Sequence, residues 1–202
     1  LFDKLWAPHR VKTLDGGEDL IAIDRVFLHE RTGSVALESI VDSGRMPLRP
    51  EHVFATMDHI VSNKAGRGGD EARTPGGDVF ITATRNAAKK TGINLIDVLD
   101  ADQGIVHVIS PELGIAQPGL TLVCPDSHTC SQGALGALAW GIGSTDAEHA
   151  IVTGCLRVKK PPQMRITVNG TLGAGVTAKD LALHIIAKYG AAGAKRCAVE
   201  YA

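Results

Sequence analysis

The 202-residue chain carries 21 Lys and Arg residues against 22 Asp and Glu residues, a formal net charge of −1. A balance of this kind, without long basic runs, argues against nucleic acid as a binding partner. Hydrophobic residues make up 44% of the chain, enough to bury a sizeable core. We therefore expect a globular protein that acts on small molecules, with residues 1–202 forming one domain.

Membrane and secreted classes are also disfavoured. The longest apolar stretches, such as residues 181–187, are far shorter than a membrane-spanning helix, and the first residues lack a basic-then-apolar leader. The cysteines are too few and too irregularly spaced for a secreted disulfide framework: Cys124, Cys130, Cys155 and Cys197. We therefore expect a cytoplasmic protein with no membrane partner.

Hydrophobic periodicity predicts strands alternating with helices along the chain. Strands are expected at residues 20–27, 53–57, 104–109 and 120–124, and helices at 33–43, 78–91, 133–143 and from about 144. The glycine-rich residues 62–77 are expected to form a mobile surface loop. Residues 163–170 predict an edge hairpin, and residues 177–188 a capped helix. The alternation predicts an α/β fold: a mainly parallel sheet with helices on both faces.

Polar clusters follow the predicted strands at three places. They are Asp58-His59, His107, and the run Asp126-Ser127-His128-Thr129. Ligands of parallel α/β sheets bind where strand ends converge on one rim, so these clusters are expected to lie together. Each polar residue taken alone could equally cap a helix or satisfy a turn.

The residue types in these clusters suit a carboxylic acid substrate and proton transfer. A helix start after Asp126-Ser127-His128 would attract an anion. A dehydration needs a base for a weakly acidic C–H proton and an acid for the departing hydroxyl. His59 beside Asp58 is a natural proton donor, whereas Ser127 could act as the base only with a strongly depressed pKa.

Several other chemistries lack their sequence signatures. No CxxC is present, and the Cys124 to Cys130 spacing is typical of neither a zinc site nor a cluster, so no metal ligation by this chain alone is expected. The chain also lacks a GxGxxG motif after a strand, a P-loop and a nucleophile elbow. Nucleotide binding and acyl transfer are therefore disfavoured.

The segments 54–59 (FATMDH), 103–108 (QGIVHV) and 123–129 (VCPDSHT), the last followed by GALGAL at 133–138, together resemble one known family. They are similar to the aconitase family of hydro-lyases, and within it to large subunits of 3-isopropylmalate dehydratases. The resemblance runs nearly end to end, from Leu5 to Glu200, and the Asp-Ser-His-Thr motif is highly specific to the family.

The resemblance implies an enzyme of leucine biosynthesis that interconverts 2- and 3-isopropylmalate. It also implies a [4Fe–4S] cluster and a separate small subunit as partner. Related hydro-lyases acting on homoaconitate, citramalate or dimethylmalate are alternatives. A further alternative is a non-catalytic, truncated paralogue that binds a carboxylate or a partner protein.

The resemblance also implies roles for the individual residues that match the family's motifs. Asp58 and His59 would handle the hydroxyl proton, with His107 and His128 supporting that network. Asp126 lies in the matching active-site loop, and Glu200 would lie near the cluster-bound hydroxyl. Substrate contacts would come from His29, Ser127 and Thr129, with Ser127 a positioning group because the family's serine base belongs to the separate swivelling domain.

The sequence departs from the family in two ways. In the family, the cysteines that bind the cluster lie in a Ser-Cys-Thr-Asn motif and a later CxxC, and residues 1–202 include neither motif. We therefore expect no cluster on this chain alone. We also expect the isolated chain to be inactive. Residues 193–196 (GAKR) replace a glycine-rich run, placing two long cations in a loop that needs glycine's freedom. Apolar surface that the rest of a subunit would cover could support a homo-oligomer.

Overall fold

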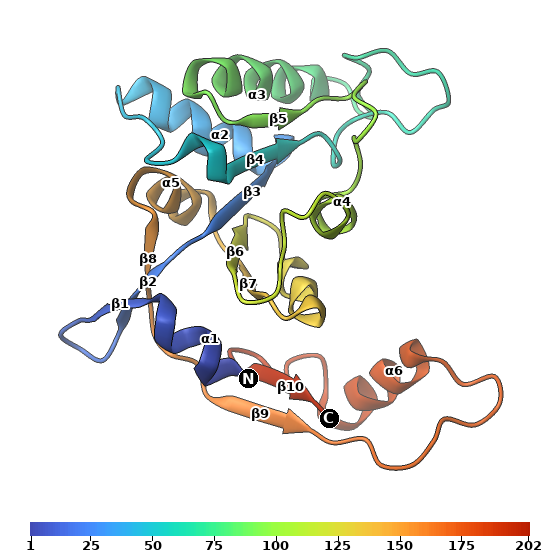
Figure 1. Cartoon of the computed structure of the whole chain (residues 1–202). Coiled ribbons are helices and arrows are strands. Elements are labelled where there is room, and N and C mark those ends of the chain that lie inside the picture. Colours follow the sequence, from blue (N-terminus) through green and yellow to red (C-terminus); the bar gives the residue numbers. More distant parts are fainter. The chain divides into compact units, whose positions relative to one another are not determined.

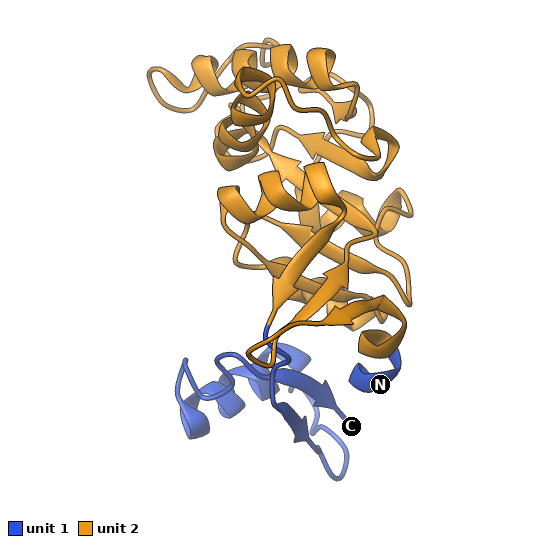
Figure 2. Cartoon of the chain, turned by 90° about the vertical axis from the view of Figure 1, so that its left-hand side faces the viewer, with its two compact units in different colours: residues 1–4, 159–202 blue, residues 5–158 orange.

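The structure, a computed structural model, describes residues 1–202 (Figure 1). It divides into two compact units, coloured in Figure 2: a larger unit, residues 5–158, and a smaller unit, residues 1–4 with 159–202. No helix has the length and apolar character needed to span a bilayer. The expectation of one domain over residues 1–202 stays a prediction, and each unit is described by itself.

A five-stranded parallel sheet forms the centre of the larger unit. The strands lie in the order β5 (Asn94–Ile96), β4 (Val53–Thr56), β3 (Arg25–His29), β6 (Thr121–Cys124) and β7 (Leu138–Gly141), and every neighbouring pair is parallel. The central strand β3 is buried from Val26 to His29, as expected for a strand covered on both faces. The predicted α/β class with a mainly parallel sheet is confirmed.

Helices cover the sheet on its two sides (Figure 1). The helices of the larger unit are α2 (Glu30–Asp42), α3 (Gly77–Thr91), α4 (Val106–Glu112) and α5 (Ser144–Thr153), with short 3-10 helices η1 (Pro50–His52) and η2 (Thr129–Leu135). Helix α2 packs against α3 and α5, whereas Val106 and Ile109 of α4 join a buried cluster with Phe27 and Leu122 of the sheet. Gly33 allows α2 to approach β3 closely, because a Cβ there would lie 2.7 Å from Cβ of Leu28.

The remaining elements form two smaller sheets. In the larger unit, β1 (Arg10–Thr13), β2 (Asp19–Ala22) and β8 (Cys155–Val158) make an antiparallel sheet. Helix α1 (Phe2–His9) begins in residues of the smaller unit and ends in the larger one. In the smaller unit, β9 (Gln163–Ile166) pairs in parallel with β10 (Ala198–Tyr201). Helix α6 (Ala178–Tyr189) begins with the predicted capping box, in which Thr177 and Asp180 bond each other's backbone N–H.

Most predicted elements are confirmed, with boundaries shifted by a few residues. The strands at 53–57 and 120–124 and the helices at 33–43, 78–91, from about 144, and at 177–188 correspond to β4, β6, α2, α3, α5 and α6. Helix α3 ends at Gly92, whose φ of 73° is the left-handed conformation that glycine favours after a helix. Residues 62–77 form a loop closed by a bridge between Val61 and Ala72. Its mobility stays a prediction.

The strand predicted at residues 104–109 is wrong, because helix α4 begins there at Val106. The β-branched run Ile105-Val106 and Val108-Ile109 suggested a strand. The structure instead starts a helix, since the backbone N–H of Val106 donates to Oδ2 of Asp58 at 2.9 Å and Ile109 packs into the core. A contact 48 residues away thus overrides local propensity.

Three further predictions are wrong. Residues 133–143 form the end of η2 and then β7, because Gly136 (φ 79°) ends the helical turn and residues 138–141 pair with β6. Residues 20–27 split into β2 and β3 around Asp24, whose carboxylate accepts the backbone N–H of Thr121 at 2.8 Å. The strand at the start of residues 163–170 forms no hairpin, because its partner is the parallel strand β10.

The altered loop at residues 193–196 contains the one non-glycine residue of the chain with a positive φ. Arg196 adopts φ 62°, the left-handed region that side chains with a Cβ rarely occupy. Glycine would adopt this conformation without strain, which explains why a glycine-rich run suits this loop better.

Candidate active site

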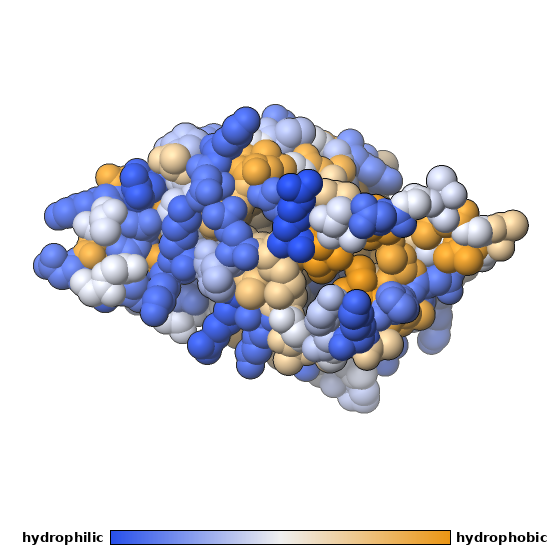
Figure 3. All heavy atoms as spheres, turned by 90° about the horizontal axis from the view of Figure 1, so that it is seen from below, coloured by the Kyte–Doolittle hydropathy of each residue, from blue (hydrophilic) through white to orange (hydrophobic).

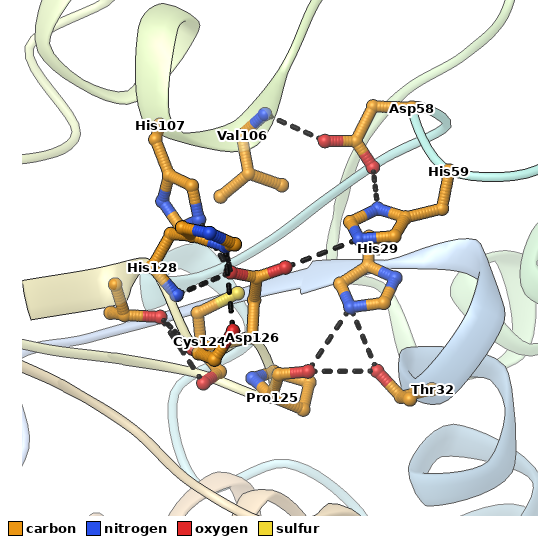
Figure 4. Close-up of polar contacts among 12 residues, drawn as sticks. His29, Thr32, Asp58, His59, Val106, His107, Cys124, Pro125, Asp126 and His128 are labelled. Carbon is orange, nitrogen blue, oxygen red and sulfur yellow. Dashed lines mark hydrogen bonds and ion pairs between the residues drawn. The ribbon is translucent and has the colours of Figure 1, made fainter. Parts of the chain in front are cut away.

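Three strand ends meet at one edge of the central sheet. His29 ends β3, Asp58 and His59 follow β4, and Asp126 follows β6. Strands β4 and β6 flank β3 and run parallel to it, so the residues after all three strands emerge at the same edge. The structure thus brings together the polar clusters that the sequence singled out, as Figure 4 shows.

Asp126 is the centre of this cluster. Its Oδ2 lies 3.1 Å from Nε2 of His59, and its Oδ1 lies 2.8 Å from Nε2 of His107. The same Oδ1 accepts the backbone N–H of His128 at 2.7 Å, with Nδ1 of that residue at 3.2 Å. One carboxylate therefore organises three imidazoles.

The pKa of Asp126 lies well below its usual range. Burial by itself would raise it, but the hydrogen bonds from the His128 backbone and the His107 side chain, with the charge of His107, outweigh that effect. Asp126 is therefore a carboxylate at neutral pH and accepts hydrogen bonds from the surrounding rings.

His59 lies between two carboxylates. Its Nδ1 is 2.6 Å from Oδ1 of Asp58, and its Nε2 faces Asp126. The hydrogen bond to Asp58 raises the pKa of His59, against the opposing effect of burial, and the charges of Asp58, Glu30 and Asp126 add to the rise. The side chain of His59 is 31% exposed, so a ring whose protonated form is favoured faces the outside of the site.

Asp58 connects two parts of the site. Its side chain is 3% exposed, and while one oxygen bonds His59, the other accepts the N–H of Val106 at the start of α4. The next residue of α4 is His107, which contacts Asp126. Asp58 therefore fixes both His59 and the helix that carries His107, and mutating it would disturb both.

His29 lies beneath His59. The two rings stack with centroids 3.8 Å apart and planes 15° from parallel. Nε2 of His29 lies 3.1 Å from the carbonyl oxygen of Pro125 and 2.9 Å from Oγ1 of Thr32. Burial and the charge of His59 lower the pKa of His29, which is 2% exposed, so the neutral form of this ring is favoured beneath His59. Its contact with a substrate carboxylate stays a prediction.

The other predicted residues have different surroundings. Oγ of Ser127 is exposed and lies 3.4 Å from Nδ1 of His128. Thr129 is buried, and its hydroxyl donates to the carbonyl oxygen of Asp126 at 2.6 Å, which braces the loop. Glu200 lies on β10 in the smaller unit, where it accepts the backbone N–H of Phe2 at 2.7 Å. The roles predicted for these three residues stay predictions.

Two buried residues of the site lie outside the predicted catalytic and substrate-binding set. Glu30, with no exposed surface, accepts backbone N–H groups of the Asp58-His59 segment. Gln132 donates from Nε2 to the carbonyl oxygen of His107 at 3.0 Å. A glutamate directly after a buried apolar strand was the available signal for Glu30, whereas nothing in the sequence indicated that Gln132 would reach α4.

Comparison with known proteins identifies the family. The chain matches the aconitase family (aconitate hydratase) over residues 3–202. It is 43% identical over 202 residues to the protein named 3-isopropylmalate dehydratase large subunit 1 of Bradyrhizobium diazoefficiens, a match that covers 100% of this chain and 42% of that relative. The chain therefore belongs to the aconitase family, as its motifs indicated, and spans less than half the length of this relative.

The cysteines of this chain do not fit an iron–sulfur cluster, which requires several thiolates at one place. Two groups of closely spaced potential ligand atoms exist, His29-Glu30-Asp58-His59 and His107-Asp126-His128, and neither contains a cysteine. Cys124 is buried, and burial raises the pKa of its thiol far above the usual range.

Proposed function

We propose that this chain forms part of the large subunit of a hydro-lyase that interconverts 2-isopropylmalate and 3-isopropylmalate. The observation that carries the proposal is the bridging of His59 and His107 by Asp126, with Asp58 on the far side of His59. Membership of the aconitase family and the likeness to a dehydratase large subunit support the reaction type.

The site residues suit the handling of a hydroxyl proton. The neighbouring carboxylates favour the protonated form of His59, and the ring is partly exposed, so it would deliver a proton to the hydroxyl that departs in dehydration. Nε2 is the nitrogen proposed to transfer this proton, because its contact with Asp126, at 3.1 Å, is longer than the 2.6 Å contact of Nδ1 with the buried Asp58. In the hydration direction the neutral ring would take the proton back at the same nitrogen.

A small acid with two or three carboxylates is the proposed substrate class. The ring of His59, whose pKa is raised, and the exposed ring of His128 (side chain 81% exposed) border the site, and imidazole N–H groups donate hydrogen bonds to carboxylates. Asp126 would keep His59 and His107 aligned while the substrate exchanges protons with His59. His29 would support His59 from its buried side rather than present a free nitrogen to solvent.

We further propose that the cluster ligands and the small subunit come from polypeptide other than these 202 residues, and that this chain alone does not turn over substrate. All four cysteines are free, which suits the reducing cytoplasm. Figure 3 shows hydrophobic side chains at the surface among hydrophilic ones. Large apolar or aromatic side chains that are at least half exposed in the smaller unit include Leu172, Leu183, Ile186 and Tyr189, which suits contact with further protein, including a second copy.

The test is an anaerobic assay of the complete subunit containing this chain, assembled with its small subunit. Formation of the unsaturated acid from 2-isopropylmalate should be observed and should exceed that from homoaconitate, citramalate and dimethylmalate. His59→Gln should lower kcat by roughly 100-fold or more. The control His149→Gln, at an exposed position on α5, should keep wild-type activity. Absence of turnover on every acid would instead support a non-catalytic binding protein.

A further inference from the structure

A buried carboxylate outside the predicted catalytic set contacts the Asp58-His59 segment. Glu30, the first residue of α2, has no exposed surface. Its Oε2 accepts the backbone N–H of Asp58 at 3.0 Å, and its Oε1 accepts that of His59 at 2.8 Å and that of Ile60. Three successive backbone donors thus converge on one side chain.

This arrangement fixes an unusual backbone path. In an extended strand, successive N–H groups point to opposite sides, so one carboxylate cannot accept three in a row. Strand β4 ends at Thr56, and the register that pairs Thr56 with His29 places Glu30 beside the residues that follow the strand. Its carboxylate therefore holds residues 58–60 in a turn that leaves the strand direction.

The turn determines where two site side chains point. Within it, Asp58 reaches both the His59 ring and the N–H of Val106, and His59 reaches Asp126. The groups that face His59 are Asp58, Asp126 and Glu30, which are acidic, and the stacked ring of His29. A change at Glu30 therefore acts on His59 through the backbone as well as through charge.

We propose that Glu30 is a positioning residue that, by accepting the N–H groups of residues 58–60, aligns Asp58 and His59 with Asp126. The proposal goes beyond the proposed function by adding a residue that touches neither substrate nor cofactor. Helix α2 provides a matched control, because Glu38 lies two turns further along and is exposed.

The first experiment measures the alignment itself in the 202-residue chain by NMR. In the wild-type chain, the amide protons of Asp58, His59 and Ile60 should exchange at least about 10-fold more slowly than those of the exposed loop residues 65–66. Glu30→Gln should remove this protection and lower the pKa of His59, while Glu38→Gln should change neither. Circular dichroism checks that each variant is folded.

The second experiment uses the assembled enzyme. Glu30→Gln should lower kcat by about 10-fold or more with KM within about twofold, because the substrate contacts remain while the proton donor is misaligned. Fast exchange of the three amide protons in the wild-type chain would overturn the proposal, even if Glu30→Gln fails to fold. So would a folded Glu30→Gln chain with unchanged protection and an unchanged His59 titration. The NMR measurements need no turnover, so failure of the proposed reaction would leave them interpretable.

Discussion

His59 and Asp126 are 67 residues apart in sequence, yet Nε2 of His59 lies 3.1 Å from Oδ2 of Asp126. The strands that precede them, β4 and β6, are not neighbours, because β3 lies between them. The contact therefore passes over the end of β3, where the ring of His29 stacks against His59. Substitutions at this edge of the sheet should affect all three segments together.

Replacing Asp126 by asparagine should uncouple the imidazoles. The neutral amide keeps the shape of the side chain but loses the charge that orients His59 and His107. In the assembled enzyme, Asp126→Asn should lower kcat by roughly 100-fold or more, and NMR should show a lower pKa for His59. The control Asp102→Asn, at an exposed position, should behave like the wild type. Undiminished activity of Asp126→Asn would refute the central role of this carboxylate.

The two stacked histidines should titrate in opposite directions from the ordinary value of 6.5. The hydrogen bond to Asp58 raises the pKa of His59. Protonated His59 therefore stabilises the folded state fully below pH 6.5, and this stabilisation is lost as pH rises through the raised pKa. Burial lowers the pKa of His29. Neutral His29 is therefore compatible with the folded state above pH 6.5, and the folded state loses stability as pH falls towards the lowered pKa.

These opposite effects should make the free energy of unfolding decline both above and below about pH 6.5. Urea denaturation between about pH 5 and 9 should show that His59→Gln flattens the decline above pH 6.5, while His29→Gln flattens the decline below it. Histidine ring resonances followed by NMR would check the order of the two pKa values directly. A His29 that titrates above His59 would contradict the assignment of charge to the His59 ring.

Gly141, at the end of β7, should tolerate no side chain. A Cβ there would lie 2.4 Å from the carbonyl oxygen of Asp126 and 3.4 Å from Cα of Ser127. Gly141→Ala should therefore displace the Asp126 loop and lower the free energy of unfolding by about 1–3 kcal/mol. Gly68→Ala is the matched control, because a Cβ at Gly68 meets nothing within 4 Å. Chemical denaturation of both variants measures the difference, and equal stabilities would show that the loop yields without cost.

The sequence predicted those parts of the fold that depend on local patterns. The buried strands β4 and β6 and the amphipathic helices α2 and α3 follow from apolar periodicity, and the end of α3 follows from Gly92. The alternation of these elements was enough to predict the parallel sheet. The order of the sheet then placed His29, His59 and Asp126 at one edge.

The predictions failed where a distant partner decides the local conformation. Residues 106–112 form a helix because Asp58 bonds Val106 and Ile109 packs into the core. Residues 138–141 form a strand because an edge of β6 is free to pair with them. In both cases the deciding partner is too distant in sequence to influence a prediction made from local propensity and periodicity.

The sequence by itself determined the family, the class of fold and the three polar segments that meet at one edge of the sheet, because these depend on residue types and on spacings along the chain. Tertiary structure alone decided which site residues contact one another. Asp126 bonds both His59 and His107, the ring of His29 stacks on that of His59, and Glu30 accepts three backbone N–H groups. Hydrogen bonds act over about 3 Å, so their partners become known only when the fold brings distant segments together.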